Sequence, residues 1–177
     1  MGKTEQILDA VGIDRILKRM AYEILEAHKG NNMALVGIHT RGVFLAQRLR
    51  ENIRTFEGAD VLVGEMDITL YRDDWTQMSA QPVVKTTQIP FSVEGKKIIL
   101  IDDVLYTGRT VRAAMDAIID FGRPASIELA VLIDRGHREL PIQSTYTGQC
   151  VSTEKAETIN VLLKECDDQD QVVLETN

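Results

Sequence analysis

The sequence predicts an α/β fold in which a central, mainly parallel sheet is flanked by helices. Three short and largely apolar segments have the composition of strands that are buried on both faces: residues 33–38, 97–101 and 126–133. Three segments with apolar residues at helical spacing alternate with these strands: residues 12–29, 43–53 and 109–121. This alternation is typical of parallel sheets that are covered by helices.

The remaining elements follow from local composition. The apolar stripe of the first expected helix, at residues 12–29, is followed by Gly-Asn-Asn, which commonly ends a helix. Residues 60–71 have an alternating pattern of side chains and are rich in β-branched residues, so we expect a long strand there. Residues 72–88 are polar and predict a long mobile loop or an exposed hairpin. Two last strands are expected at residues 158–164 and 171–175, and without repeats or linkers residues 1–177 are expected to form one domain.

Composition narrows the class of protein. The net charge of −7 argues against a protein that coats nucleic acid by bulk electrostatics, although it allows a local basic face. No apolar run approaches about 18 residues, so we expect no membrane span. Cys150 and Cys166 lack the spacing of metal ligands, and free thiols are expected. Together these features predict a cytoplasmic protein without a metal site of its own.

Three loops follow three of the predicted strands, and each is rich in polar groups. They comprise residues 39–42, 102–110 and 134–138. Because the carboxyl ends of parallel strands meet at one edge of a sheet, the loops are expected to open together and to form a ligand site.

The middle loop combines a pair of acids with a glycine turn. Asp102 and Asp103 end an apolar strand, where two carboxylates repel each other unless hydroxyl groups or cations satisfy them. Thr107, Gly108 and Thr110 then lead directly into a helix, whose first N–H groups suit a phosphate. A solvated strand end or a helix cap is the alternative for the acids alone. The combination favours a sugar phosphate.

This segment resembles the phosphoribosyl pyrophosphate (PRPP) signature of type I phosphoribosyltransferases. It matches neither a Walker A loop nor a dinucleotide fingerprint, since both glycine patterns are absent. The resemblance implies the fold of that family, with a small hood and a mobile loop beside the sheet. It also implies that Asp102 and Asp103 hold the ribose hydroxyls, while residues 106–110 hold the 5′-phosphate.

The loop of residues 39–42 is similar to the pyrophosphate loop of the same family, which often holds a non-proline cis peptide bond. Its amides and the cation of Arg41 would neutralise a developing pyrophosphate, whereas a plain exposed turn is the alternative. The substrate-binding residues predicted in this way are Thr40, Arg41, Gly42, Asp102, Asp103, Val104, Leu105, Tyr106, Thr107, Gly108, Arg109 and Thr110.

Longer blocks, at residues 63–74, 104–113 and 134–142, resemble the PyrR family of pyrimidine-operon regulators and uracil phosphoribosyltransferases. The implied reaction converts uracil and PRPP to UMP and pyrophosphate, with Mg²⁺ carried by PRPP. The resemblance implies catalytic roles for Asp102 and Asp103. Arg72 lies in a segment that could close over the leaving group, although an ordinary surface arginine is equally compatible. By the same resemblance Asp134 and Arg135 are assigned to the edge of the base pocket, although a role in forming the turn alone is equally compatible.

The same resemblance implies UMP-dependent binding of leader mRNA and a homodimer or higher homo-oligomer. RNA binding needs cations and groups that recognise bases, which Lys18, Tyr22 and Arg138 supply. The family usually carries Thr, His and Arg where this chain has Lys18, Tyr22 and Gln143. Uracil phosphoribosyltransferase activity without RNA binding therefore stays an alternative, as does a purine or orotate phosphoribosyltransferase.

Overall fold

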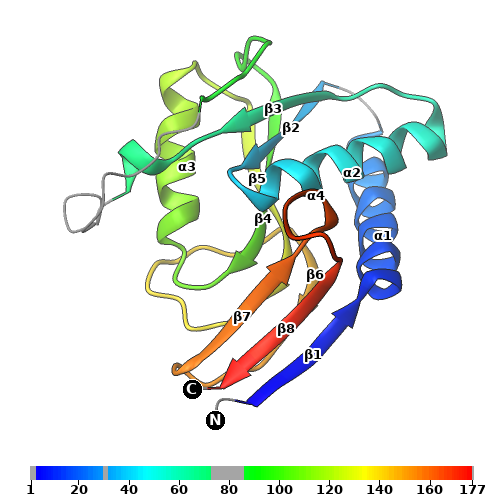
Figure 1. Cartoon of the computed structure of the whole chain (residues 1–177). Helices are drawn as coiled ribbons and strands as arrows, with labels where there is room; N and C mark the ends of the chain where they lie inside the picture. Colours follow the sequence, from blue (N-terminus) through cyan, green and yellow to red (C-terminus); the bar gives the residue numbers. More distant parts are fainter. Residues whose placement is uncertain (1–2, 30–31, 73–85, 177) are drawn as a thin grey trace.

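A computed structural model describes residues 3–29, 32–72 and 86–176 of the chain. Its centre is a five-stranded sheet in the order β3–β2–β4–β5–β6, in which every neighbouring pair of strands is parallel (Figure 1). The strands are β2 (Met33–Ile38), β3 (Leu62–Met66), β4 (Lys97–Leu105), β5 (Ser126–Asp134) and β6 (Tyr146–Cys150). The predicted parallel sheet is confirmed.

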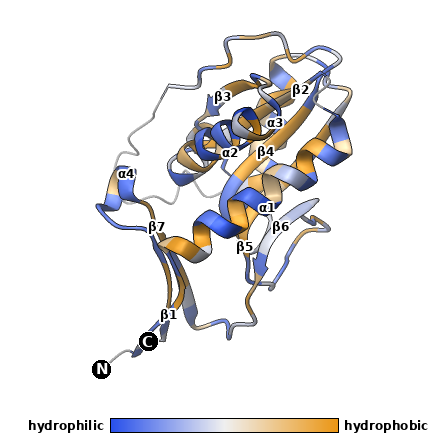
Figure 2. Cartoon of the chain, turned by 90° about the vertical axis from the view of Figure 1, so that its right-hand side faces the viewer, coloured by the Kyte–Doolittle hydropathy of each residue, from blue (hydrophilic) through white to orange (hydrophobic). Residues whose placement is uncertain are grey.

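Helices cover both faces of this sheet, and the strand sequences explain why. Along β2, Met33 and Leu35 belong to the core under α1 (Ala10–His28) and α2 (Arg41–Glu57), whereas Val36 belongs to the core under α3 (Arg109–Asp120). Because successive side chains of a strand point to opposite faces, a strand between two helical layers must be apolar throughout. Figure 2 shows β4 accordingly coloured as hydrophobic over much of its length.

A second sheet is antiparallel and has the order β1–β8–β7, from β1 (Lys3–Asp9), β7 (Glu157–Leu162) and β8 (Gln171–Thr176). The short helix α4 (Lys164–Asp167) connects β7 to β8. Figure 1 shows the three strands side by side below α4, with both chain ends at their far end. Ile159, Val161 and Val172 bury their side chains in the same core as α1 and α2, which joins this predicted hood to the large sheet.

Several boundaries differ from the prediction. The expected strand at residues 60–71 is the shorter β3, followed by a 3₁₀ turn (Thr69–Tyr71). Strand β4 runs four residues beyond the expected end at residue 101, so the two acids belong to the strand itself. Strands β1 and β6 were not predicted. Most of the expected loop at residues 72–88 lies outside the described residues, although Gln88 pairs with Glu65.

Both cysteines are free, as predicted, and both are exposed. Over the described residues, no helix has both the length and the apolar character needed to span a membrane.

Candidate functional site

Two carboxylates lie near the carboxyl end of β4, in the centre of the large sheet. Asp102 is 7% exposed and is paired in register with Val131 of β5. Its Oδ1 accepts the N–H of Asp103 at 2.9 Å, and the Oδ1 of Asp103 accepts the N–H of Val104 at 2.8 Å. Burial raises the pKa of Asp102 well above its usual value, and the charge of Asp103 raises it further. A ligand that donates hydrogen bonds here would favour the charged form.

A cavity of about 300 Å³ opens beside these acids and collects residues from three segments of the chain, within 39–41, 67–72 and 102–110. The predicted site residues that line it are Thr40, Arg41, Arg72, Asp102, Asp103, Val104 and Thr110. The fold therefore brings the first and second of the predicted loops to one place, as parallel strands require.

A second cavity, of about 260 Å³, lies at the start of α3 and is lined by residues 104–111 together with Arg72. Gly108 has a φ of +92°, which favours glycine, and it stands at the N-cap of α3. The first N–H groups of a helix attract anions, so this cavity suits a phosphate. Arg72, Val104 and Thr110 line both cavities, so the two adjoin along these residues.

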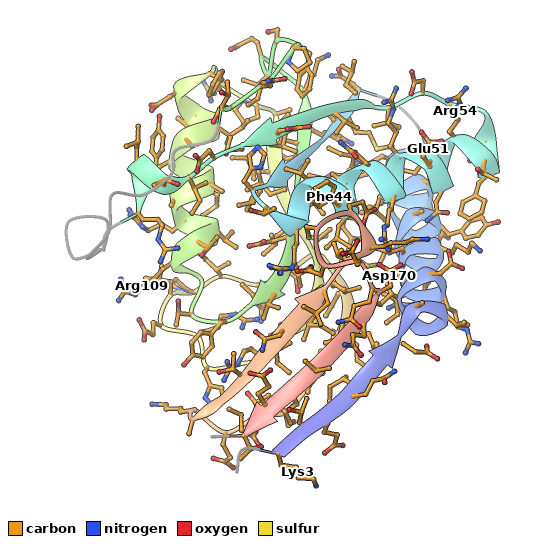
Figure 3. The ribbon with its side chains drawn as sticks, in the orientation of Figure 1. Lys3, Phe44, Glu51, Arg54, Arg109 and Asp170 are labelled. Atoms are coloured by element: carbon orange, nitrogen blue, oxygen red, sulfur yellow. The ribbon has the colours of Figure 1, made fainter. Side chains whose placement is uncertain are left out.

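Arg109, although it belongs to the predicted loop, directs its guanidinium outward (Figure 3). Its Nε donates to Glu139 at 2.7 Å, and both side chains are about half exposed. Leu105, Tyr106, Thr107 and Gly108, which also belong to the predicted loop, line the cavity at the start of α3.

The loop before α2 approaches β4 closely. The His39–Thr40 peptide bond is cis, a feature that the sequence alone could not show. A Cβ atom on Gly42 would lie 2.3 Å from the carbonyl oxygen of Ile101, so only glycine fits. Arg41 donates to Asp167 of α4 from Nε at 3.2 Å and from Nη2 at 2.9 Å. Partial burial works against its charge, yet the carboxylate of Asp167 raises the pKa of Arg41 above its usual value.

Three polar residues of the cavity were missed by sequence reasoning: His39, Asp67 and Thr69. The ring Nε2 of His39 lies 3.5 Å from a carboxylate oxygen of Glu65. Asp67 accepts hydrogen bonds from the N–H and the hydroxyl of Thr69, at 2.9 and 2.6 Å. The only signal in the sequence was the position of these residues at the carboxyl ends of β2 and β3, where ligands bind.

Asp134 and Arg135 line a different cavity, which is formed by the turn after β5 and by residues between 143 and 153. The guanidinium of Arg135 lies over the ring of Tyr106, 4.1 Å from its centroid, and donates to the carbonyl of Glu154 at 3.1 Å. Through this contact with Tyr106, Arg135 packs against the loop of residues 102–110. Asp134 accepts the N–H of Gly136 at 2.9 Å and shapes the turn.

The three predicted RNA-binding residues occupy two places. Lys18 and Tyr22 lie on α1: Lys18 pairs with Asp14 at 2.7 Å, and Tyr22 is exposed and stacks on Phe56 with ring centroids 3.9 Å apart. Arg138, in the turn after β5, donates to several backbone carbonyls, including that of Tyr106 at 3.0 Å, and to Asp134. The guanidinium of Arg138 thus organises its own turn.

The pKa of Asp102 leads to a prediction about stability. Its folded pKa is raised, so the folded protein binds the proton more tightly than the unfolded chain does. Stability is therefore lost as the pH rises from about 4 toward the folded pKa, and the loss is constant above it. Asp102→Asn removes this cost, so we expect its stability advantage over the wild type to grow as the pH rises from about 4 toward 7. Urea unfolding of both proteins between pH 4 and 8 measures this. A difference that does not grow with pH would contradict it.

Comparisons with known proteins agree with this geometry. The family model of the phosphoribosyl transferase domain matches residues 3–166. The chain is 58% identical over 170 residues to the Bifunctional protein PyrR of Pelotomaculum thermopropionicum, covering 96% of this chain and 94% of the relative. It is 54% identical over 180 residues to the Bifunctional protein PyrR of Bacillus velezensis, covering 100% and 99%.

Solved structures show the same fold at low identity. A hypoxanthine phosphoribosyltransferase from Staphylococcus aureus has a TM-score of 0.71 at 20% identity, covering 96% of this chain and 90% of that one. The hypoxanthine phosphoribosyl transferase of Trypanosoma cruzi has a TM-score of 0.74 at 16% identity, with the same coverage. At this level of identity the likeness concerns the fold alone.

Proposed function

The chain belongs to the phosphoribosyl transferase family and, within it, to the PyrR proteins, and from this premise we propose that it has two activities. It transfers the phosphoribosyl group of PRPP to uracil, which gives UMP and pyrophosphate. It also regulates pyrimidine-operon transcription by binding leader mRNA when UMP occupies the same site. The observation that carries the proposal is that the cavity beside the two acids and the cavity at the start of α3 adjoin, with Arg72, Val104 and Thr110 lining both.

Each part of PRPP has a complementary place in this site. The carboxylates of Asp102 and Asp103 accept hydrogen bonds from the ribose hydroxyls, and the start of α3 holds the 5′-phosphate. The pyrophosphate lies toward Thr40 and Arg41. Arg72, between the two cavities, is placed to contact either phosphate group. The base lies near Tyr106, with Asp134 and Arg135 behind it as the edge of the base pocket.

The chemistry follows from this placement. As the glycosidic carbon separates from pyrophosphate, positive charge grows on the ribose and negative charge grows on the leaving group. The carboxylates face the positive charge and Arg41 faces the negative charge, so catalysis is mainly positioning and electrostatic stabilisation. The carboxylate oxygens of the cavity are donors of the kind that Mg²⁺ prefers, so they suit Mg²⁺ delivered with PRPP. When bound, Mg²⁺ neutralises charge on the leaving pyrophosphate.

Conversion of radiolabelled uracil tests the enzymatic part. UMP is expected to form only when PRPP and Mg²⁺ are both present, and hypoxanthine, guanine and orotate should not compete with uracil. Formation of a purine nucleotide or of orotidylate in place of UMP would overturn the assignment of the base.

RNA binding is tested by titrating labelled pyrimidine-operon leader RNA with the protein in filter-binding experiments. We expect UMP to tighten binding. Lys18 is about half exposed and its pair with Asp14 is a surface ion pair, so little energy keeps it from an RNA phosphate. Lys18→Gln is therefore expected to weaken binding several-fold and to lower the salt slope by about one. Binding that responds to neither UMP nor Lys18→Gln would favour the enzyme without RNA regulation.

Both activities use partners found in the cytoplasm of bacteria, and the protein is accordingly proposed to act there as a homodimer or higher homo-oligomer. Analytical ultracentrifugation measures the oligomeric state.

A further inference from the structure

The segment that connects β7 to β8, residues 163–170, binds one face of α2 through ion pairs. Arg41 and Arg48 are seven residues apart, which places them on the same side of the helix. Asp167 pairs with Arg41, while Glu165 and Asp170 both pair with Arg48, at 2.6 and 2.7 Å. Figure 1 shows α4 against the beginning of α2, and Figure 3 shows Asp170 there. The second sheet thus contacts the helix that begins in the pyrophosphate loop.

The pair between Arg41 and Asp167 has the geometry of a fixed fork. Two guanidinium N–H groups meet the two carboxylate oxygens, at 3.2 and 2.9 Å. Asp167 is itself fixed, because its Oδ2 also accepts the N–H of Leu163 at 2.9 Å and contacts the thiol of Cys166 at 3.1 Å. Arginine carries five N–H donors, and Asp167 takes two of them. The remaining donors belong to a side chain that lines the cavity beside Asp102 and Asp103.

We propose that Asp167 is a positioning residue for pyrophosphate: it holds the guanidinium of Arg41 in the orientation in which its remaining donors meet the pyrophosphate of PRPP. This inference rests on the proposed function, because it assumes that the cavity takes PRPP. Asp167 need not touch the substrate. It acts by fixing a flexible side chain before the substrate arrives, which removes part of the ordering cost of binding.

The direction in which Asp167→Asn changes the affinity for PRPP separates positioning from simple charge balance. Asp167 is negative and lies near a site for a polyanion, so its charge alone weakens PRPP binding. Neutralising it would then tighten binding. Loss of the fork acts in the opposite direction, because an asparagine amide presents an N–H₂ group where Arg41 needs an acceptor. Weaker binding of PRPP by Asp167→Asn therefore reports positioning.

The chain offers a matched control in Asp170. Asp170 lies in the same segment, pairs with an arginine of α2, and accepts a backbone N–H, that of Lys164 at 2.8 Å. Asp170→Asn thus weakens the docking of the second sheet on α2 without changing Arg41. UMP is the matched ligand, since it has the ribose and the 5′-phosphate but no pyrophosphate.

Isothermal titration of full-length protein with PRPP and Mg²⁺, and separately with UMP, tests the proposal. We expect Asp167→Asn to weaken PRPP binding about three- to tenfold and to leave the affinity for UMP unchanged. Asp170→Asn should change neither affinity. Asp167→Glu keeps the charge but displaces the fork, so it should also weaken PRPP binding, and it replaces the asparagine variant if that protein does not fold. In an Arg41→Gln background, Asp167→Asn should have no further effect.

Unchanged or tighter PRPP binding by both Asp167 variants overturns the proposal. Equal losses of PRPP affinity in Asp167→Asn and Asp170→Asn also overturn it, because they would show that only the docking of the second sheet on α2 matters. If the variants give one of these results while the wild-type protein still binds PRPP, the proposed function stands. A wild-type protein that binds no PRPP overturns both.

Discussion

Replacing Asp102 and Asp103 together with asparagine is expected to lower kcat/KM for PRPP by roughly 10²–10⁴-fold. Each carboxylate would lose a charge-assisted hydrogen bond to a ribose hydroxyl, worth about 1.5–3 kcal/mol. The loss should also appear in kcat, because the two negative charges face the positive charge that develops on the ribose. Initial rates of uracil conversion over a range of PRPP concentrations measure both parameters.

A suitable control is Asp116→Asn on α3, because Asp116 is an exposed acid that pairs only weakly with Arg112. Its turnover should equal that of the wild type. The double variant should also remain folded, since the buried charge of Asp102 destabilises the empty protein. Wild-type turnover by a folded Asp102→Asn, Asp103→Asn protein would disprove the assignment of the acid pair.

The second large effect is expected for Gly42→Ala. The added Cβ would lie 2.3 Å from the carbonyl oxygen of Ile101. The oxygen belongs to the backbone and the Cβ is fixed in place by the backbone, so neither atom can rotate away. Either the start of α2 or the strand just before Asp102 must shift. We expect a loss of about 1–3 kcal/mol of stability, which is several degrees in Tm for a chain of this size, and a nearly complete loss of PRPP binding. Thermal unfolding and calorimetry measure the two effects.

Gly12→Ala provides the comparison within the same chain. A Cβ at Gly12 would meet the end of the Leu8 side chain at 3.1 Å and the N-cap carboxylate of Asp9 at 3.2 Å, and both contacts are with side-chain ends that can move. Alanine also favours the helix, so the change in stability should stay within about 1 kcal/mol. If Gly42→Ala were tolerated as well as Gly12→Ala, the close approach of α2 to β4 would not be essential to the site.

The sequence was informative where side-chain pattern alone decides the structure. The apolar runs of β2, β4 and β5 had to be buried on both faces, and the acid pair with its glycine turn had few alternatives. The end of β4 was placed too early because Asp102 and Asp103 are polar. Their backbone nevertheless continues to pair with β5, where Asp102 is opposite Val131 and Val104 is opposite Ile133. Ladder hydrogen bonds do not depend on side-chain polarity.

Other features could not be predicted because their partners are distant in sequence. Strand β1 is mostly exposed and acquires its structure from pairing with β8, at the other end of the chain. Asp167 meets Arg41 across 126 positions, and neither residue carries a local signal for the other. Asp67 and Thr69 enter the cavity only because β3 lies beside β2. Such contacts depend on the order of strands in the sheet, which local periodicity leaves open.

The pairing of β1 with β8 also sets an order of events during synthesis. β1 is translated before the large sheet and β8 after it, so the second sheet can close only when both have left the ribosome. The acid pair and the phosphate loop are made earlier, at residues 102–110, and Asp167 follows on the order of seconds later. A nascent chain can therefore already contain residues 102–110 while Arg41 still lacks its carboxylate partner.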